Sequence, residues 1–190
     1  VTGRSLKATN LLSLDFDHHE GARQATQHLI DLGHRRIAFI GGVVEHPDAI
    51  ERLQGYRSAL EAAGLRFEPA LVVPGAFTEH SGLLAVEQLL ERRTRYSAIF
   101  AANDQMAIGA ALGLYRHGRR VPDDVSLVGF DDVAGALYMV PPLTTVHHPI
   151  QELGELAARA MLNLLAGERP KVEVPTPRLI VRESTRVVTA

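Results

Sequence analysis

The 190-residue chain contains no cysteine and no tryptophan, and it has no long apolar run. The absence of cysteine excludes disulfides and thiolate sites and is compatible with the cytosol. No stretch approaches the roughly 20 apolar residues of a membrane span. No secretory signal is evident, although the chain begins with Val1 rather than methionine. The net charge is −2 with no block of lysine or arginine, so the composition does not require a nucleic-acid or membrane partner.

Several catalytic and cofactor signatures are missing as well. The chain has no Gly-x-Ser-x-Gly nucleophile elbow, no Gly-x-Gly-x-x-Gly fingerprint and no P-loop. The nine histidines include the adjacent pairs His18-His19 and His147-His148, but neighbours in sequence rarely bind one ion together. We therefore expect no metal ion, no cofactor and no enzymatic activity.

Strand and helix patterns alternate along most of the chain. Apolar runs predict strands at 11–16, 36–41, 71–73, 97–102, 125–130 and 178–182. Helical spacing predicts helices at 17–32, 48–63, 78–92, 104–117 and 150–166, while prolines and threonines make 141–149 extended. This order is typical of an α/β fold with a parallel sheet that helices cover on both faces.

The same spacing predicts which helix residues face inward. In the helix at 48–63 these are Ile50, Leu53, Tyr56 and Leu60, and at 78–92 they are Leu83, Val86 and Leu90. At 104–117 they are Ala107, Ile108, Ala111, Leu112 and Tyr115, and at 150–166 they are Leu153, Leu156, Ala157, Ala160 and Leu164.

Polar side chains follow two strands where the strands end. Asn103 follows the strand at 97–102, and Asp131 follows the strand at 125–130. Ligands of open parallel sheets bind beyond the carboxyl ends of the strands, so we expect both residues to face a ligand crevice. With Arg52 they form a carboxamide, a carboxylate and a guanidinium, which suit a ligand with vicinal hydroxyls.

Neighbouring residues admit simpler interpretations. Asp104 and Asp132 are interpreted as caps of the helices that follow them. Phe77 follows the strand at 71–73, where an aromatic ring could stack on a sugar face or could be an ordinary surface hydrophobe.

Six ordered segments resemble the lactose- and galactose-repressor (LacI/GalR) family. They are Leu32-Gly-His-Arg-Arg-Ile-Ala-Phe-Ile-Gly41, Arg52-Leu-Gln-Gly-Tyr-Arg-Ser-Ala-Leu60, Ala101-Ala-Asn-Asp-Gln-Met-Ala-Ile-Gly109, Val121-Pro-Asp-Asp-Val-Ser-Leu-Val-Gly-Phe-Asp-Asp132, Pro142-Leu-Thr-Thr-Val146 and Val181-Arg-Glu-Ser-Thr185. The resemblance implies a periplasmic-binding-protein type I fold, in which two doubly wound subdomains are hinged around a ligand. The C-terminal subdomain would be nearly complete here and the N-terminal one partial.

The resemblance also implies roles for single residues. Arg52, Asn103 and Asp131 match the family's effector-contacting residues, and Phe77 falls where a pocket aromatic is common. The remaining pocket positions are His46 and Asp48 in the variable loop, together with His148, which stands where many members have glutamine. The crossings between subdomains are expected at Asp17 and at Val146-His147, extending to Pro149.

The same resemblance divides the chain into four parts. Residues 1–17 would be a remnant of the N-terminal subdomain, and 18–145 would form the C-terminal subdomain. Residues 146–177 would return to the N-terminal subdomain with a helix, and 178–190 would add the last strand and tail. Because only the strand at 11–16 would remain of the N-terminal sheet, we expect this helix to leave an apolar face exposed.

The function implied is the effector-binding core of a cytoplasmic transcriptional regulator. The partners expected are a small metabolite, most simply a sugar, a second copy of the chain, and operator DNA held by a helix-turn-helix head that these residues lack. The helix at 104–117 and the run 133–140 would supply the homodimer contact, unless that run only covers the sheet edge.

Two other functions remain open from the sequence. A periplasmic sugar-binding protein of a transporter shares the fold, although the Gly-His-Arg-Arg-Ile and Arg-Glu-Ser-Thr segments favour the regulator. An enzyme has no supporting motif. The effector's identity, the operator and the choice between induction and co-repression stay open.

Overall fold

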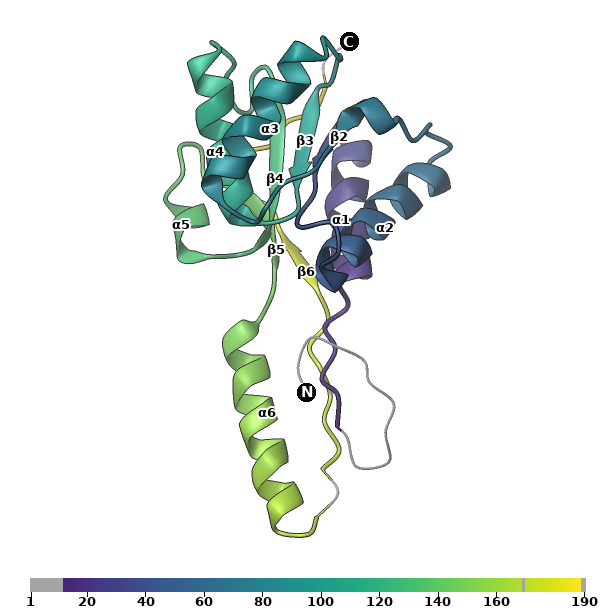
Figure 1. Cartoon of the computed structure of the whole chain (residues 1–190), viewed down its shortest axis with the longest axis vertical. Coiled ribbons are helices and arrows are strands. Elements are labelled where there is room, and N and C mark those ends of the chain that lie inside the picture. The colour runs from purple at the N-terminus through teal and green to yellow at the C-terminus, as the bar shows by residue number, and fades with distance from the viewer. Residues whose placement is uncertain (1–11, 169, 189–190) are drawn as a thin grey trace.

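A six-stranded sheet with helices on both faces forms the body of the protein (Figure 1). The computed structural model describes residues 12–168 and 170–188. The strands are β1 (Ile37–Ile40), β2 (Val72–Val73), β3 (Ala98–Ala101), β4 (Ser126–Asp131), β5 (Thr144–His147) and β6 (Arg178–Ile180). The helices are α1 (His18–Asp31), α2 (Pro47–Ala62), α3 (Glu79–Glu91), α4 (Asp104–Arg116), α5 (Ala134–Leu137) and α6 (Ile150–Leu165), with a 3-10 turn η1 (Pro69–Leu71).

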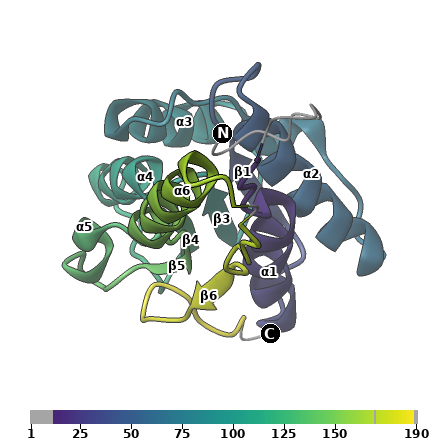
Figure 2. The same ribbon diagram turned by 90° about the horizontal axis from the view of Figure 1, so that it is seen from below.

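The strand order is β2-β1-β3-β4-β5-β6, in which the first five strands are parallel and β6 is antiparallel to β5. The α1–α2 pair covers one face, and the α3–α4 pair covers the other (Figure 2). Strands covered on both sides must be apolar throughout, and every residue of β1 and β3 is buried. This doubly wound sheet confirms the predicted fold class.

The helix ends are defined by local polar contacts. Asp17 caps α1 by accepting from the Glu20 amide at 2.8 Å, and Asn103 caps α4 by accepting from the Met106 amide at 2.9 Å. Glycines with left-handed backbone follow α1, α2, α4 and α6, namely Gly33, Gly64, Gly118 and Gly167. After α3 the same position is held by Arg93, whose φ is 52°.

Two glycines let α3 and α4 touch through their backbones. A Cβ on Gly109 would lie 1.7 Å from the Glu79 carbonyl oxygen, and one on Gly82 would lie 2.0 Å from the Met106 carbonyl oxygen. The two helices therefore form a close pair that fixes the loops at their ends, including the loop before Asn103.

Three predictions about the helices and strands are corrected. In place of the strand at 11–16, the described part shows only an isolated bridge at Leu14, and Leu11 lies outside the described residues. Ile50, predicted to face inward, is 44% exposed. In α4 the buried side consists of Met106, Ala107, Gly109, Ala110, Gly113 and Leu114, while Tyr115 is 76% exposed. Close packing on α3 buries the face that carries Gly109 and Gly113, whereas the spacing rule chose a neighbouring face that carries Ile108, Leu112 and Tyr115.

Helix α6 stands apart from the sheet, below the body in Figure 1. Leu153 and Ala160 are buried, but Leu164 is 44% exposed and Leu165 is 78% exposed. The apolar face expected on this helix is therefore exposed over its second half, while two of its predicted inward residues are covered.

No helix in the described ranges is both long and apolar enough to cross a membrane.

Candidate functional site

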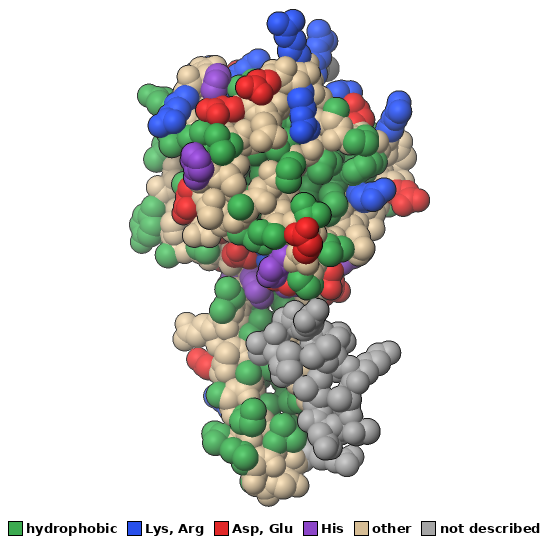
Figure 3. All heavy atoms as spheres, viewed as in Figure 1, with side chains coloured by type: hydrophobic (Ala, Val, Ile, Leu, Met, Phe, Trp, Pro, Cys, Tyr) green, Lys and Arg blue, Asp and Glu red, His purple; other side chains and the backbone are tan. Residues whose placement is uncertain are grey.

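The candidate site lies at the carboxyl ends of the parallel strands. Asn103 comes directly after β3 and Asp131 is the last residue of β4, while Arg52 is on the first turns of α2 after β1. Histidine and acidic side chains gather at the junction between the sheet body and α6 (Figure 3). The sheet topology therefore brings residues from separate parts of the sequence to one edge.

Arg52 is the centre of this site. Its side chain is 4% exposed, and its guanidinium lies 3.8 Å from the Phe130 ring centroid and donates from Nη2 to Asp131 Oδ1 at 3.1 Å. Nη1 donates to the Ala102 carbonyl, next to Asn103. Burial lowers the pKa of Arg52 from its ordinary value, and the charge of Asp131 opposes that shift. The pair is a desolvated cation held in place by an anion that reaches solvent.

His18 belongs to the same cluster, and the sequence analysis did not single it out. Arg52 Nε donates to His18 Nδ1 at 3.4 Å, so Nε2 carries the proton and points at Asp48 Oδ2, 3.5 Å away. Burial first, and the positive charge of Arg52 second, lower the pKa of His18 to about 3. His18 is therefore neutral, and it contacts Arg52 through Nε and also through Nη2, the nitrogen that donates to Asp131.

A cavity opens beside this cluster. It has a volume of about 330 Å³ and is lined by Leu14, Phe16, His18, Asp48, His148, Ile150, Leu153 and Gly154. His148 Nδ1 lies 3.7 Å from Asp131 Oδ1, and its ring packs 4.4 Å from that of Phe16. Aromatic walls with a few convergent polar groups are the usual composition of a small-ligand site.

Phe77 and His46 form one rim near Arg52. The two rings are 5.5 Å apart and meet edge to face, and the Arg52 guanidinium lies 5.9 Å from the Phe77 ring. Phe77 has a φ of 58° and packs where a Cβ on Gly42 would stand, 2.0 Å from the ring. His46 is half exposed and lies 3.8 Å from Asp48. Phe77 therefore lies beside the arginine, and His46 joins the cluster through Phe77 and Asp48.

Asn103 makes hydrogen bonds both to α4 and to the loop that contains Phe77. Its Oδ1 caps α4, and its Nδ2 donates to the Phe77 carbonyl at 3.1 Å. The structure thus brings Asn103 to the edge of the cluster, with its polar atoms engaged by the backbone.

The capping roles assigned to Asp104 and Asp132 are wrong. Asp104 is fully buried and accepts from the Val133 amide and from Thr145 Oγ1, and burial raises its pKa to about 7. Asp132 accepts from Arg182 at 2.6 Å and from His147 at 2.9 Å. Burial acts to raise the pKa of Asp132, but these hydrogen bonds outweigh it and lower the pKa. A carboxylate after a strand has several partners within reach, and the sequence did not reveal which one it takes.

The predicted crossing residues lie at two places, at the start of α1 and between β5 and α6. Asp17 precedes α1, His147 ends β5, and Val146 is fully buried between Phe130 and Leu179 of the neighbouring strands. The described residues contain no group of three or more histidine and acidic side chains that could hold a metal ion.

A doubly wound sheet with a polar cavity at its carboxyl edge, closed by a further helix, defines a ligand-binding domain of the periplasmic-binding-protein type. Residues 26–185 match the periplasmic binding protein-like domain. A sugar-binding transcriptional regulator of the LacI family from Escherichia coli is 37% identical, with a TM-score of 0.93 over 98% of this chain and 68% of its own. The chain belongs to the LacI family.

Two further comparisons concern one relative. The transcriptional regulator CelR of Thermobifida fusca is 45% identical over 173 residues, which are 90% of this chain and 51% of that protein. The structure of a CelR–cellobiose complex matches with a TM-score of 0.88 and 43% identity, over 96% of this chain and 57% of that one. This chain spans about half the length of the curated relatives it matches.

Proposed function

We propose that this chain is the effector-binding and dimerisation core of a transcriptional regulator, and that its effector is a sugar. The observation that carries the proposal is the buried Arg52–Asp131 pair at 3.1 Å, which lies beside a cavity lined by Phe16, His18 and His148. His18 contacts Arg52, and His148 lies 3.7 Å from Asp131. The carboxylate accepts sugar hydroxyls, the guanidinium donates to ring or hydroxyl oxygens, and the aromatic walls cover the apolar sugar face.

The relatives support the regulator over a periplasmic transport protein. They include CelR, for which a cellobiose complex is known, and the ribose operon repressor of Escherichia coli, which is 44% identical over 143 residues. Operator DNA would be bound by a helix-turn-helix head outside these residues, and the protein would act in the cytoplasm. The sugar would favour one closure of the subdomains and thereby shift the spacing of the heads in a dimer.

Our division into subdomains follows the same logic. Residues 18–145 and 178–190 would form the C-terminal subdomain, and residues 1–17 and 146–177 would belong to the N-terminal one. The sheet lies within the first set except for Val146 and His147 at the end of β5, and α6 is separate from the sheet, which supports this division.

The homodimer contact would lie on α4 and residues 133–140. Tyr115 on α4 is 76% exposed, and Tyr138 and Val140 in the run 133–140 are 80% and 98% exposed. Within residues 133–140 it is therefore mainly Ala136, which is buried, that covers the sheet. Sedimentation should show a dimer, and Tyr115→Glu combined with Tyr138→Glu should convert it to a monomer. A wild-type protein that stays monomeric at high micromolar concentration would contradict this part of the proposal.

Calorimetry with cellobiose, ribose and other neutral sugars tests the ligand class. We expect at least one sugar to bind, and Asp131→Ala to weaken it about ten- to a hundredfold, the effect of losing a charged hydrogen bond. Asp123→Asn, at a solvent-exposed carboxylate, is the matched control and should bind normally. Equal affinity in Asp131→Ala and the wild type would refute the role of the carboxylate.

A further inference from the structure

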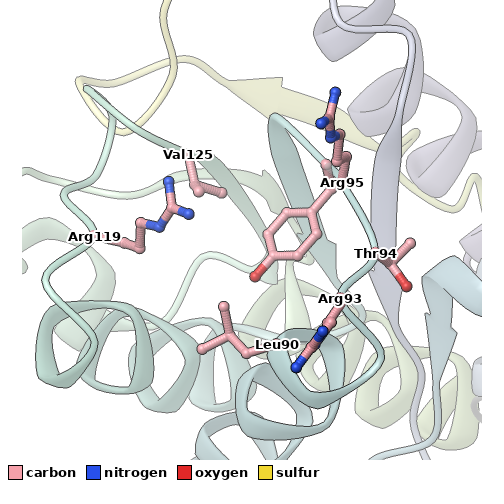
Figure 4. A pocket seen from close by; sticks show the side chains of 7 residues that line it. Leu90, Arg93, Thr94, Arg95, Arg119 and Val125 are labelled. Carbon is pink, nitrogen blue, oxygen red and sulfur yellow. The ribbon is translucent and has the colours of Figure 1, made fainter.

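A second cavity lies at the opposite end of the same strands. It has a volume of about 420 Å³ and is lined by Leu90, Arg93, Thr94, Arg95, Tyr96, Arg119 and Val125 (Figure 4). Tyr96 and Val125 precede β3 and β4, so this cavity is at the amino edge of the sheet, away from the Arg52 cluster. Its size is within the range of small-molecule sites.

The lining carries three arginines and no carboxylate. Within the ranges that the structure describes, the guanidinium groups of Arg93, Arg95 and Arg119 have no hydrogen-bond or ion-pair partner. Other arginines at this end are occupied: Arg36 pairs with Glu68 at 2.6 Å, and Arg92 donates to two backbone carbonyls. Three unpaired cations around one cavity leave a concentrated positive charge that an anion would neutralise.

The residue at position 93 differs from that at the ends of the other long helices. The other four long helices end in a left-handed glycine, because a residue with a Cβ is disfavoured there. Only α3 has an arginine in that position, with a φ of 52°. The helix end itself would be served better by glycine, so a glycine at this position would remove the guanidinium without straining the backbone.

The cavity wall is apolar and aromatic. Leu90 and Val125 flank the inward-pointing Arg119 in Figure 4. Tyr96 and Arg119 line the same cavity; burial raises the pKa of the Tyr96 phenol, and the charge of Arg119 acts in the opposite direction. A cationic rim over an apolar wall suits a ligand with an anionic group and an apolar or ring-shaped body.

We propose that this cavity binds a small phosphate-bearing molecule, whose phosphate is held by Arg93, Arg95 and Arg119 and whose body packs on Tyr96. Guanidinium groups match phosphate oxygens in paired hydrogen bonds, which makes a phosphate the best fit for this rim. The concave shape and small volume favour a small molecule over a phosphorylated protein segment.

Phenyl phosphate is a suitable probe, with phenol and inorganic phosphate for comparison. Calorimetry and chemical-shift mapping should show phenyl phosphate binding at the amino edge, more tightly than inorganic phosphate and far more tightly than phenol. Arg119→Gln and Arg93→Gly should each weaken it about tenfold, the effect of losing one charged hydrogen bond. Arg116→Gln, which removes the same charge from an exposed position outside the cavity, should bind like the wild type.

Arg93→Gly separates a ligand role from a structural one. Glycine relieves the left-handed backbone, so this variant should melt at the same or a higher temperature while it loses phenyl phosphate binding. A lower melting temperature with unchanged binding would overturn the proposal. So would the absence of binding at millimolar probe, equal weakening by Arg116→Gln, or binding of an acidic phosphopeptide but not of phenyl phosphate.

Discussion

Replacing Asp131 by asparagine tests whether the Arg52–Asp131 pair supports both the fold and the ligand. Asparagine has the same shape and tolerates the positive φ of 111° at this position, so the change removes little except the charge. Breaking a buried ion pair costs about 3–5 kcal/mol. Asp131 is 20% exposed and asparagine still accepts from Arg52, so we expect about 2 kcal/mol of lost unfolding free energy.

Thermal and urea denaturation measure this effect. A chain of this size loses about 2–4 °C of melting temperature per kcal/mol, so Asp131→Asn should melt about 4–8 °C lower. Sugar binding, measured by calorimetry on the folded variant, should fall at least about tenfold because the hydroxyls lose a charged acceptor.

The double variant Arg52→Met with Asp131→Asn separates the two roles. Methionine keeps the contact with the Phe130 ring and leaves no buried charge. Its stability cost should be at least about 1 kcal/mol smaller than the sum of the two single costs, while sugar binding stays lost. Additive costs, or recovered binding, would refute the reasoning that the pair is coupled and contacts the ligand.

Three further predictions concern pH and packing. Because the pKa of His18 falls to about 3 on folding, the unfolded chain takes up a proton below pH 6.5 that the folded chain does not. The free energy of unfolding should therefore drop from pH 7 to pH 5. The His18→Gln variant should reduce this drop by up to about 2 kcal/mol. Equal drops in both proteins would contradict this. The pKa of Asp104 is raised to about 7, so the stability that its protonated form contributes is full below pH 4 and is lost as pH rises through 7. The melting temperature of Asp104→Asn should therefore rise relative to that of the wild type between pH 5 and pH 8. A difference between the two melting temperatures that does not change with pH would argue against this. Gly109→Ala should lower the free energy of unfolding by about 1–3 kcal/mol because the new Cβ meets the α3 backbone. Gly154→Ala, on α6 with no atom near the new Cβ, should raise it by up to about 1 kcal/mol. Equal effects of the two substitutions would show that the α3–α4 contact is not tight.

The strand–helix order was predictable because its signals are local. The apolar runs of β1 and β3 are uninterrupted. Thr78 marks the start of α3 by its side-chain cap, and Gly33 and Gly118 mark helix ends by their left-handed backbone. The face of α4 was not predictable from size and spacing. The close approach of α3, which Gly82 and Gly109 permit, depends on a partner 27 residues away along the chain.

In the candidate site, too, some residues were predictable from the sequence and others were not. Arg52 and Asp131 were predicted from strand ends and from the family resemblance, and the structure joins them at 3.1 Å. His18 was missed because a histidine in the first turn of an amphipathic helix resembles any surface histidine. Its role arises from a ring nitrogen 3.4 Å from Arg52, a contact between residues that are 34 positions apart.

The way each pocket residue is anchored tells a protein engineer where to change the ligand. Arg52 and Asn103 bond to backbone carbonyls or amides, so substitutions there would also weaken the hydrogen bonds that hold the neighbouring loops. The described contacts of the His46 and His148 side chains are with other side chains: Asp48 and Phe77 for the first, Asp131 and two aromatic rings for the second. A library restricted to these two positions would sample new specificities at little cost in folding yield, which suits the chain to conversion into a sensor for other metabolites.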